Sequence, residues 1–268
     1  MRAGANAFLR IFFRPGTACA SAIALAGASA WASAPDVVGL RDGETLTYSV
    51  SWGFIPSVGR IRITADSIGS GRDAVLRITT TTWTWGPARA LFPFDGRGES
   101  VYSLPTGRLL SASEWSTYRN KVVKNSLAFD YGRSQAAYTD EIHPNKNRTI
   151  SMPSGIPSDL ILALIQTRNW NLRRGEQRDA LVVFEDQIYP LTIHPENVDY
   201  VVTAIGVFRA LCLVPRMEKA PALGMFKRGS TVRVWIEQDD DRRLPVRFEV
   251  GFRFGAGTAT IIDYQPPK

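Results

Sequence analysis

Two alternating runs near the C-terminus most constrain how this chain of 268 residues can fold. The first covers residues 231–237 and the second residues 246–254, and an acidic and basic turn ending at Pro245 separates them. Alternation of apolar and polar residues with a period of two places successive side chains on opposite faces of a strand. The pattern therefore predicts a β-hairpin, and residues 258–264 predict a third strand that completes a meander.

The same signal recurs along most of the chain. It predicts further strands at residues 44–52, 60–67, 74–85, 99–104, 108–118, 121–130, 136–141, 145–152, 180–185, 187–194, 199–204 and 207–214. Between two of these strands, residues 86–98 contain Pro87 and Pro93 and predict an irregular loop. Such a loop could form a lid or rim over a cavity, or it could pack against the edge of the core.

Residues 158–170 interrupt the strand pattern and predict one helix. Ser158 is a suitable N-cap, and the run from Leu160 to Ile165 is apolar on every side of the first turns, which is typical of a buried helix. The predicted fold is mainly β: a strongly curved antiparallel meander sheet, as a half-barrel or open barrel, around one buried helix near 158–170. No repeat or linker divides the chain, so we expect a single β-rich domain over residues 33–268.

The first 32 residues have the features of a secretory signal peptide. Arg2, Arg10 and Arg14 precede an apolar run rich in small residues, and Ala30-Trp31-Ala32 suits a cleavage site. A retained membrane anchor is the alternative, but the run is shorter than the roughly 20 apolar residues that a spanning helix needs. We expect cleavage after Ala32, export to the periplasm, and a mature protein that is not transmembrane.

Charge and cysteine content exclude several classes of protein. Cleavage removes three arginines and no acidic residue, so the formal net charge falls from +7 to 7 − 3 = +4. The remaining basic residues form no block or stripe, so nucleic acid is not an expected partner. Cys212 is then the sole cysteine, and alternation places it beside Phe208, Ala210 and Val214 as a small buried residue rather than a disulfide partner.

Residues suited to catalysis are scarce. The two histidines, His143 and His194, each precede a proline and have no metal-ligand spacing. The three carboxylates at residues 239–241 could bind Ca²⁺ or transfer protons, but Arg242 and Arg243 beside them favour a solvated hairpin tip held by Asp–Arg pairs. We therefore predict no enzyme activity, no catalytic residues, no metal and no cofactor.

Large aromatic side chains are more numerous than a modest core requires. Curved sheets with apolar concave faces can hold lipids, so these side chains could line a cavity, although they could equally pack the helix against the sheet. The predicted ligand-binding residues on the cavity and its rim are Trp52, Trp83, Trp85, Phe92, Phe94, Leu160, Leu164, Met225, Phe226 and Trp235.

Several short motifs occur in an order that resembles a known family of exported bacterial proteins. The motifs are Gly43-Glu44-x-Leu46-x-Tyr48-x-x-x-Trp52, Gly206-x-Phe208-x-x-x-Cys212, Val234-Trp235-Ile236, Arg243-Leu244-Pro245-Val246 and Tyr264. This order resembles domain of unknown function 3108 (DUF3108) over nearly all of the mature chain. The resemblance implies a periplasmic, β-rich protein, and the architecture is loosely similar to half-barrels that carry lipoproteins or lipids through the periplasm.

Two functions follow as expectations. The first is a periplasmic, non-enzymatic, monomeric protein that binds or carries a hydrophobic envelope component, such as a lipid, in a cavity of the sheet. The alternative is a scaffolding protein with a solid core that contacts an envelope protein through an edge strand or an exposed apolar loop, such as Met225-Phe226.

Overall fold

The computed structural model describes residues 38–184, 186–219, 226, 230–252 and 255–268. The predicted signal peptide and Met225 lie outside these residues, so both remain predictions. Among the described residues, no helix has the length and apolar character needed to cross a membrane.

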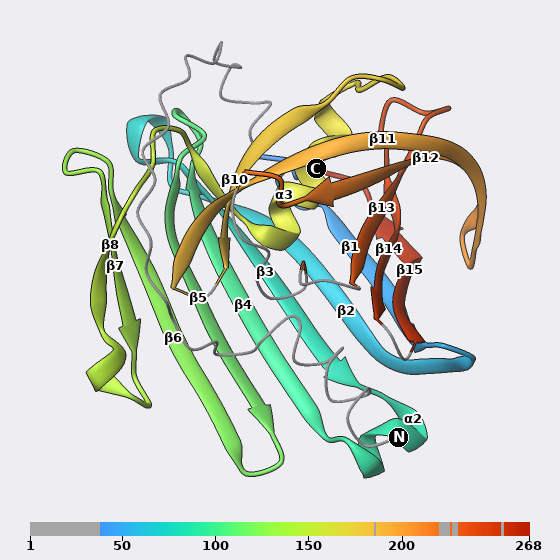
Figure 1. The fold of residues 1–268 in the computed structure, drawn as a ribbon, viewed down its shortest axis with the longest axis horizontal. Helices are drawn as coiled ribbons and strands as arrows, with labels where there is room; N and C mark the ends of the chain where they lie inside the picture. Colours follow the sequence, from blue (N-terminus) through green and yellow to red (C-terminus); the bar gives the residue numbers. More distant parts are fainter. Residues whose placement is uncertain (1–37, 185, 220–225, 227–229, 253–254) are drawn as a thin grey trace.

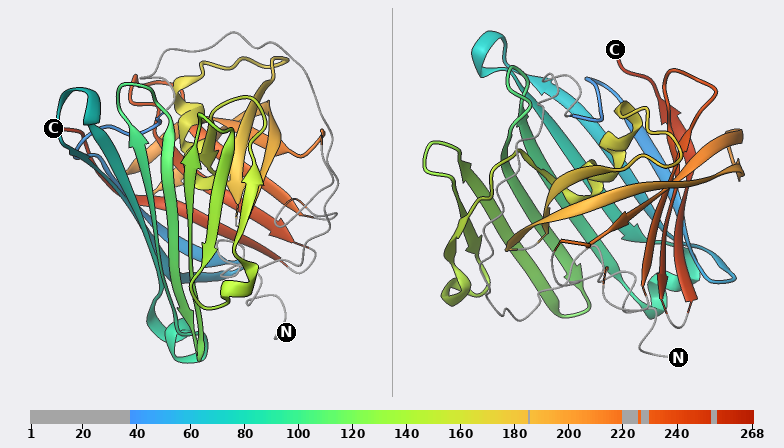
Figure 2. Two further views of the ribbon diagram at one scale, coloured as in Figure 1. Left: turned by 90° about the vertical axis from the view of Figure 1, so that its left-hand side faces the viewer. Right: turned by 45° about the horizontal axis from the view of Figure 1, so that its top comes forward.

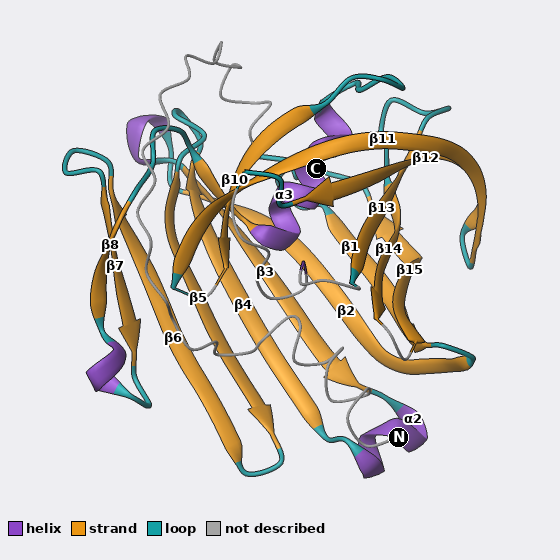
Figure 3. Ribbon diagram, in the orientation of Figure 1, coloured by secondary structure: helices purple, strands orange, loops and turns teal. Residues whose placement is uncertain are grey.

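One sheet contains all fifteen described strands, and Figure 3 shows how strongly strands dominate the fold. Its order is β8-β7-β6-β5-β4-β3-β2-β1-β15-β14-β13-β12-β11-β10-β9, and every pair is antiparallel except β9 with β10. The first half consists of β1 (Thr45–Trp52), β2 (Ile55–Ile68), β3 (Val75–Thr84), β4 (Phe94–Ser103), β5 (Leu109–Tyr118), β6 (Lys121–Asp130), β7 (Gln135–Asp140) and β8 (Arg148–Ser151). The second half consists of β9 (Pro157–Asp159), β10 (Arg178–Phe184), β11 (Gln187–Thr203), β12 (Gly206–Arg216), β13 (Thr231–Glu237), β14 (Pro245–Phe252) and β15 (Gly255–Gln265).

The mainly β, antiparallel prediction is confirmed, but the predicted strong curvature is wrong. The sheet is not closed, because its end strands β8 and β9, of four and three residues, do not pair with each other, and it is not strongly curled. Figures 1 and 2 show instead that β10 and β11 cross one face of β3–β5. We call this covered face of β1–β7 the inner face.

The helix α3 (Leu160–Gln166) packs in the space between these two parts of the sheet. Five of its residues, Leu160 and Leu162–Ile165, are buried in the main core with side chains from both halves of the sheet. The predicted N-cap is wrong by one residue. Asp159 caps the helix, because its Oδ1 accepts from Ile161 N at 2.9 Å and Leu162 N at 3.3 Å, whereas the hydroxyl of Ser158 pairs with that of Tyr102. A 3₁₀ turn, η4 (Thr167–Asn169), follows α3 directly.

Two further segments differ from the predicted elements. Residues 86–98 include a short helix, α2 (Gly86–Leu91), and the first residues of β4. Pro87 favours the helix because proline suits a first helical turn. The predicted strands at 187–194 and 199–204 are one strand, β11, because an irregular register between Pro195 and Val198 accommodates the proline without ending the strand. The remaining short 3₁₀ helices are η2 (Gly71–Asp73) and η3 (Pro144–Lys146).

The C-terminal meander forms as predicted. In the β13–β14 pair, Val232 faces Val250 and Val234 faces Phe248, and β15 then joins β14 to β1. This pairing connects the two halves of the sheet and completes the frame on which the inner face is built.

Candidate functional site

Six small residues on β3, β4 and β5 form one continuous part of the inner face. Thr80 lies opposite Gly98 and Thr82 opposite Gly96 in the β3–β4 pair, and Gly96 lies opposite Ser116 in the β4–β5 pair. Directly opposed residues in a sheet project from the same face. We call this set, with Ser100 added, the small-residue face: Thr80, Thr82, Gly96, Gly98, Ser100 and Ser116.

Five of the six residues of the small-residue face are buried and Gly98 is half-buried, and one buried atom of the face lacks a partner among the described residues. Thr82 is 4% exposed and Ser116 is 3% exposed. The Oγ1 atom of Thr82 has no hydrogen-bond partner among the described residues. A Cβ placed on Gly98 would meet only Ser113 O, at 3.8 Å, so the described part of the chain leaves room above this strand. Buried hydroxyls are normally hydrogen-bonded, so Thr82 marks a position where a bound molecule would gain a hydrogen bond.

A carboxylate lies beside the small-residue face. Glu114 on β5 is opposite Gly98 and therefore projects from the same face. Its Oε1 accepts from Ser116 Oγ at 3.4 Å, and its Oε2 accepts from Asn125 Nδ2 at 3.5 Å. These long hydrogen bonds orient the carboxylate on the inner face.

The small-residue face begins where the contacts of α3 end. On the same strands, Ile78 and Tyr102 belong to the main core, and the Tyr102 hydroxyl is 2.9 Å from Ser158 Oγ. It also accepts from Asp159 N at 3.3 Å. Burial raises the pKa of Tyr102 above its ordinary value, so this hydroxyl stays protonated. The inner face is thus divided into a packed part beneath α3 and a part with short side chains beyond it.

Four predicted site residues lie on the inner face or in the core. Trp52 packs against the main core, and Phe94 is 3% exposed with its N–H donated to Thr84 Oγ1 at 3.0 Å. Leu160 and Leu164 are buried core residues of α3. Of these four residues, Phe94 lies on a strand of the small-residue face, two positions before Gly96 on β4.

The other predicted site residues lie elsewhere. Trp83 and Trp85 alternate with Thr82 and Thr84, so Trp83 projects from the opposite face of β3, and Trp85 is 51% exposed at the end of that strand. Phe92 is partly buried after α2, and Phe226 packs against Tyr189, with 6.5 Å between the ring centroids. Trp235 is buried and donates from Nε1 to Asp199 Oδ2 at 2.9 Å, and Met225 lies outside the described residues.

Sequence reasoning missed the small-residue face because each of its members is unremarkable alone. The signal that could have identified it is the pair of glycines at alternate positions of β4, Gly96 and Gly98, facing threonines at alternate positions of β3. Glycine inside a strand often marks a place where another molecule approaches the backbone closely.

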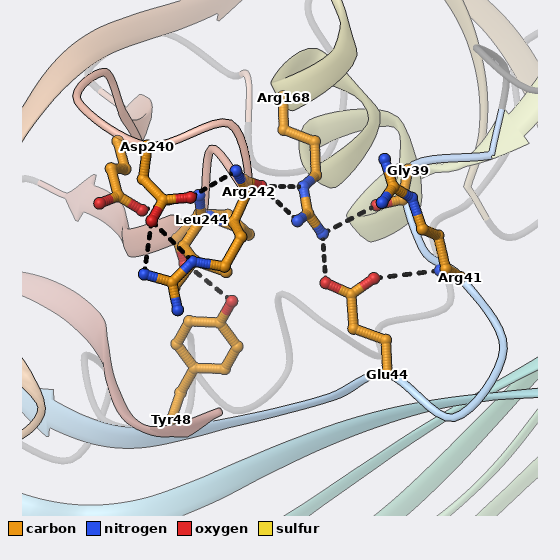
Figure 4. A network of polar contacts seen from close by, with 10 residues as sticks. Gly39, Arg41, Glu44, Tyr48, Arg168, Asp240, Arg242 and Leu244 are labelled. Carbon is orange, nitrogen blue, oxygen red and sulfur yellow. Dashed lines mark hydrogen bonds and ion pairs between the residues drawn. The ribbon is translucent and has the colours of Figure 1, made fainter. Parts of the chain in front are cut away.

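A cavity with both apolar and charged lining residues lies where β1 begins and β2 ends. It measures about 370 Å³, and its lining includes Leu40, Glu44, Leu76, Arg168 and Arg242. Figure 4 shows its central contact, an ion pair of 2.6 Å between Arg168 Nη1 and Glu44 Oε1. Glu44 is 1% exposed and Arg168 is 9% exposed.

The contacts of Arg168 connect different parts of the chain. Arg168 also donates from Nε to Arg242 O at 2.9 Å and from Nη1 to Gly39 O at 3.2 Å. Glu44 Oε2 accepts from Arg41 N at 3.0 Å. The pair thus joins the segment before β1, the turn η4 and the β13–β14 turn, which is a structural role.

The acidic turn between β13 and β14 has the predicted Asp–Arg pairs. Asp240 accepts from Arg242 N at 2.7 Å and from Arg242 Nε at 2.9 Å, and the Arg242 guanidinium lowers the pKa of Asp240. Asp239 accepts from Arg209 at 2.9 Å. Arginine neutralises these carboxylates, and no group of three metal-ligand side chains occurs within the described residues.

The histidines and the cysteine form no cluster in the described structure. His194 Nε2 lies 2.9 Å from Glu218 Oε1, and His143 Nδ1 lies 3.5 Å from Asp140 Oδ1, but neither histidine lines the cavity described above. Cys212 is buried in the main core, as its alternation predicts. Burial raises the pKa of its thiol to about 12, so it has little thiolate to act as a nucleophile.

The end of the β11–β12 hairpin exposes several apolar side chains. In the β11–β12 pair, Val202 lies opposite Val207 and Tyr200 opposite Arg209. The neighbouring strand β10 pairs with β11 only up to Ile193, and β13 pairs with β12 only from Ala210. We call this segment the hairpin end, with Val198, Tyr200, Val202 and Val207 as its apolar residues, exposed by 46%, 76%, 67% and 63%.

Comparison with known proteins identifies a family and a similar fold. The family model described as "Protein of unknown function (DUF3108)" matches residues 47–262, and no curated protein sequence matches the chain. A crystal structure of a β-barrel-like protein of domain of unknown function DUF1849 from Brucella abortus has a TM-score of 0.52 and 8% identity, covering 86% of this chain and 100% of that one. A DUF1089 family protein from Pseudomonas aeruginosa has a TM-score of 0.38 and 11% identity, covering 78% and 90%.

Proposed function

This chain belongs to the DUF3108 family, whose function is unknown. From the geometry of the inner face, we propose that the protein binds a lipid-like molecule of the cell envelope against the small-residue face. It does so without catalysing a reaction, as a monomer in the periplasm. The resemblance expected from the sequence motifs is confirmed by the family match, whereas location and ligand belong to this proposal.

The buried, unpartnered hydroxyl of Thr82 is the observation that carries the proposal. A small-residue stripe alone would be compatible with close packing of another element. Here, however, a Cβ on the adjacent strand at Gly98 would meet no described atom nearer than 3.8 Å. Space above a sheet together with a polar atom that lacks a partner is what a ligand site requires.

The surrounding side chains favour an amphiphile. Ile61 and Ile63 on β2 lie opposite Thr82 and Thr80, so apolar residues border the face on one side. On the other side Glu114 and Asn125 offer a carboxylate and an amide. An apolar chain would rest on the β2 side, and a headgroup with hydroxyl or ammonium donors would reach Glu114.

The predicted signal peptide supports a role in the envelope, since its features direct a protein across the inner membrane. The chain offers no group of three metal-ligand side chains among its described residues, and Cys212 is buried. Both observations favour binding over catalysis.

The hairpin end supports a second candidate, a protein that docks to an envelope partner. No described strand pairs with β11 after Ile193, and none pairs with β12 before Ala210, although Gln238 N still donates to Arg209 O at 2.9 Å. A strand of another chain could add to the remaining edge on either side. Removing the exposed side chains of Tyr200 and Val202 would abolish such a contact and leave a ligand on the inner face in place.

Native mass spectrometry of the protein purified from its producing cell, with organic extraction of bound molecules, tests the first candidate. Gly98→Leu places a large side chain on the inner face, and Thr81→Leu places the same side chain on the opposite face of β3 as a control. We expect a co-purifying lipid in the wild-type and Thr81→Leu proteins and its loss in Gly98→Leu. Equal lipid content in all three proteins, or no lipid with no uptake of a fluorescent fatty acid, would refute the proposal.

A further inference from the structure

Three neighbouring turns at one end of the sheet expose large apolar side chains to solvent. They are the β1–β2 turn, the segment around α2 between β3 and β4, and the β5–β6 turn, and Figures 1 and 2 show all three at the same end. We call this the tip end. Its apolar residues and their exposed fractions are Phe54 at 92%, Ile55 at 48%, Trp85 at 51%, Leu91 at 65% and Val122 at 43%.

Direct contacts hold these turns next to one another. Trp85 N donates to Val58 O at 3.0 Å, and α2 contacts β2. Arg119 N donates to Pro93 O at 3.4 Å, and Arg119 Nη2 donates to Leu91 O at 3.4 Å. The exposed side chains therefore belong to one surface formed by three separate loops.

The tip end is also basic. Residues 53–60, 85–95 and 118–122 contain four basic residues and one acidic residue, a balance of 4 − 1 = +3. The acid is Asp95, which Arg89 pairs at 2.8 Å, while Arg60 lies 5.6 Å from the centroid of the Trp85 ring. Arg119 and Lys121 are exposed beside Leu91 and Val122.

The opposite ends of the same strands lack both properties. Residues 66–74 and 104–108 contain two basic and two acidic residues, so their balance is zero. The large apolar side chains exposed there, Ile68 and Leu104, are only 39% exposed each. The apolar and basic character is therefore specific to one end of the sheet.

We propose that the tip end docks the protein onto the surface of a membrane that contains anionic lipids. Phe54, Trp85 and Leu91 would enter the boundary between headgroups and acyl chains, where aromatic and apolar side chains are favoured. Arg60, Arg119 and Lys121 around them would contact lipid phosphates, since anionic leaflets attract clustered Arg and Lys. Separate projecting side chains on convex turns suit a fluid lipid surface better than a peptide, which needs a groove or a free strand edge.

Sedimentation with vesicles tests this inference. The probes are vesicles of equal parts phosphatidylglycerol and phosphatidylcholine, compared with vesicles of phosphatidylcholine alone. The tip-end variant combines Phe54→Ser, Trp85→Ser and Leu91→Ser, and the control removes three equally exposed side chains from the hairpin end by Val198→Ser, Tyr200→Ser and Val202→Ser.

We expect the wild-type protein to bind the anionic vesicles, the tip-end variant to lose at least tenfold in affinity, and the control to bind like the wild type. Arg119→Glu with Lys121→Glu should weaken binding, and added salt should do the same. If the tip-end variant does not fold, Phe54→Ser alone carries the test, because that side chain is almost fully exposed.

Several results would overturn the proposal: no vesicle binding, equal binding to neutral vesicles, equal loss in both triple variants, or capture of an acidic protein without binding to vesicles. The readout does not depend on a molecule bound at the small-residue face. Failure of ligand extraction and failure of vesicle binding can therefore be told apart.

Discussion

Glu44 and Arg168 form a buried ion pair of 2.6 Å between residues 124 positions apart in the chain. The carboxylate comes from the start of β1 and the guanidinium from the turn after α3, so the contact ties the edge of α3 to the centre of the sheet. Backbone groups of Gly39, Arg41 and Arg242 also hydrogen-bond these two charges. The ion pair therefore has a structural role, and its contribution to the stability of the fold depends on both partners being present.

Removing one partner of this pair should strongly destabilise the protein. Arg168→Met leaves the Glu44 carboxylate buried without its cation, which costs about 3–5 kcal/mol in the free energy of unfolding. Urea unfolding measures the change. The exposed pair Arg209–Asp239 is the control, and Arg209→Met should change the free energy by less than about 1 kcal/mol.

The double variant Arg168→Met with Glu44→Met should be more stable than Arg168→Met alone, since it no longer buries an uncompensated charge. A double variant as unstable as the sum of the two single variants would show that the two charges do not interact energetically.

Asp159 should make stability depend on pH. Burial raises the pKa of this carboxyl in the folded protein above its ordinary value of 3.8, although the N–H groups of Ile161 and Leu162 act in the other direction. The folded state therefore holds the proton at a pH where the unfolded state has released it. The contribution of Asp159 to stability is thus greatest below the unfolded pKa and declines as pH rises towards the folded pKa.

Asp159→Asn isolates this effect, because asparagine caps a helix about as well and does not titrate. We expect the asparagine variant to gain stability relative to the wild type as pH rises above about 4, the ordinary Asp pKa. Chemical unfolding of both proteins between acidic and neutral pH measures the difference. A difference that is constant with pH, or that changes in the opposite direction, would contradict the prediction.

Cys212 should resist thiol reagents in the folded protein. Its side chain is buried between β11 and β13, and burial raises its pKa to about 12, so both access and thiolate content are low. Peptide mass spectrometry after iodoacetamide treatment at pH 8 should find Cys212 unmodified in native protein and fully modified in urea. Rapid labelling of native protein would show that the β12 strand opens readily.

Local patterns explain which parts of this structure could be predicted from sequence. Alternation indicates strands directly, so the meander from Thr231 to Gln265 was predictable, as was the burial of Cys212. Whether the sheet closes was not predictable, because closure depends on pairing between the two end strands. The end strands β8 and β9 are short and do not pair with each other. The N-cap of the helix was predictable to within one residue, since Ser158 and Asp159 are both capable caps and only the tertiary contact of Ser158 with Tyr102 decides between them. The end of the helix was not, because α3 ends at Gln166 and a 3₁₀ turn follows it.

The functional surfaces were less predictable because they combine distant residues. Thr82 and Ser116 become neighbours through Gly96 only once the register of three strands is known. The aromatic residues were visible in the sequence, but alternation within β3 places Trp83 on the opposite face from Thr82. Long-range register therefore decides which conspicuous side chains can meet a ligand.

Thr82 and Thr84 offer a matched pair for testing the small-residue face. Both lie on the inner face of β3 and both are buried, but Thr84 Oγ1 accepts from Phe94 N at 3.0 Å, whereas Thr82 Oγ1 has no partner among the described residues. Valine has nearly the same shape as threonine and lacks the hydroxyl. Thr84→Val should cost about 1–3 kcal/mol in the free energy of unfolding, because it leaves a buried N–H unpaired. Thr82→Val should be neutral or slightly stabilising in the ligand-free protein, since it removes a buried polar atom that makes no hydrogen bond among the described residues.

In the ligand-bound protein, Thr82→Val should weaken binding while Thr84→Val changes it little. Urea unfolding before and after organic extraction, with lipid content measured by mass spectrometry, distinguishes these outcomes. Destabilisation of the extracted protein by Thr82→Val as large as that by Thr84→Val would show that the Thr82 hydroxyl serves the fold and has no free capacity for a ligand.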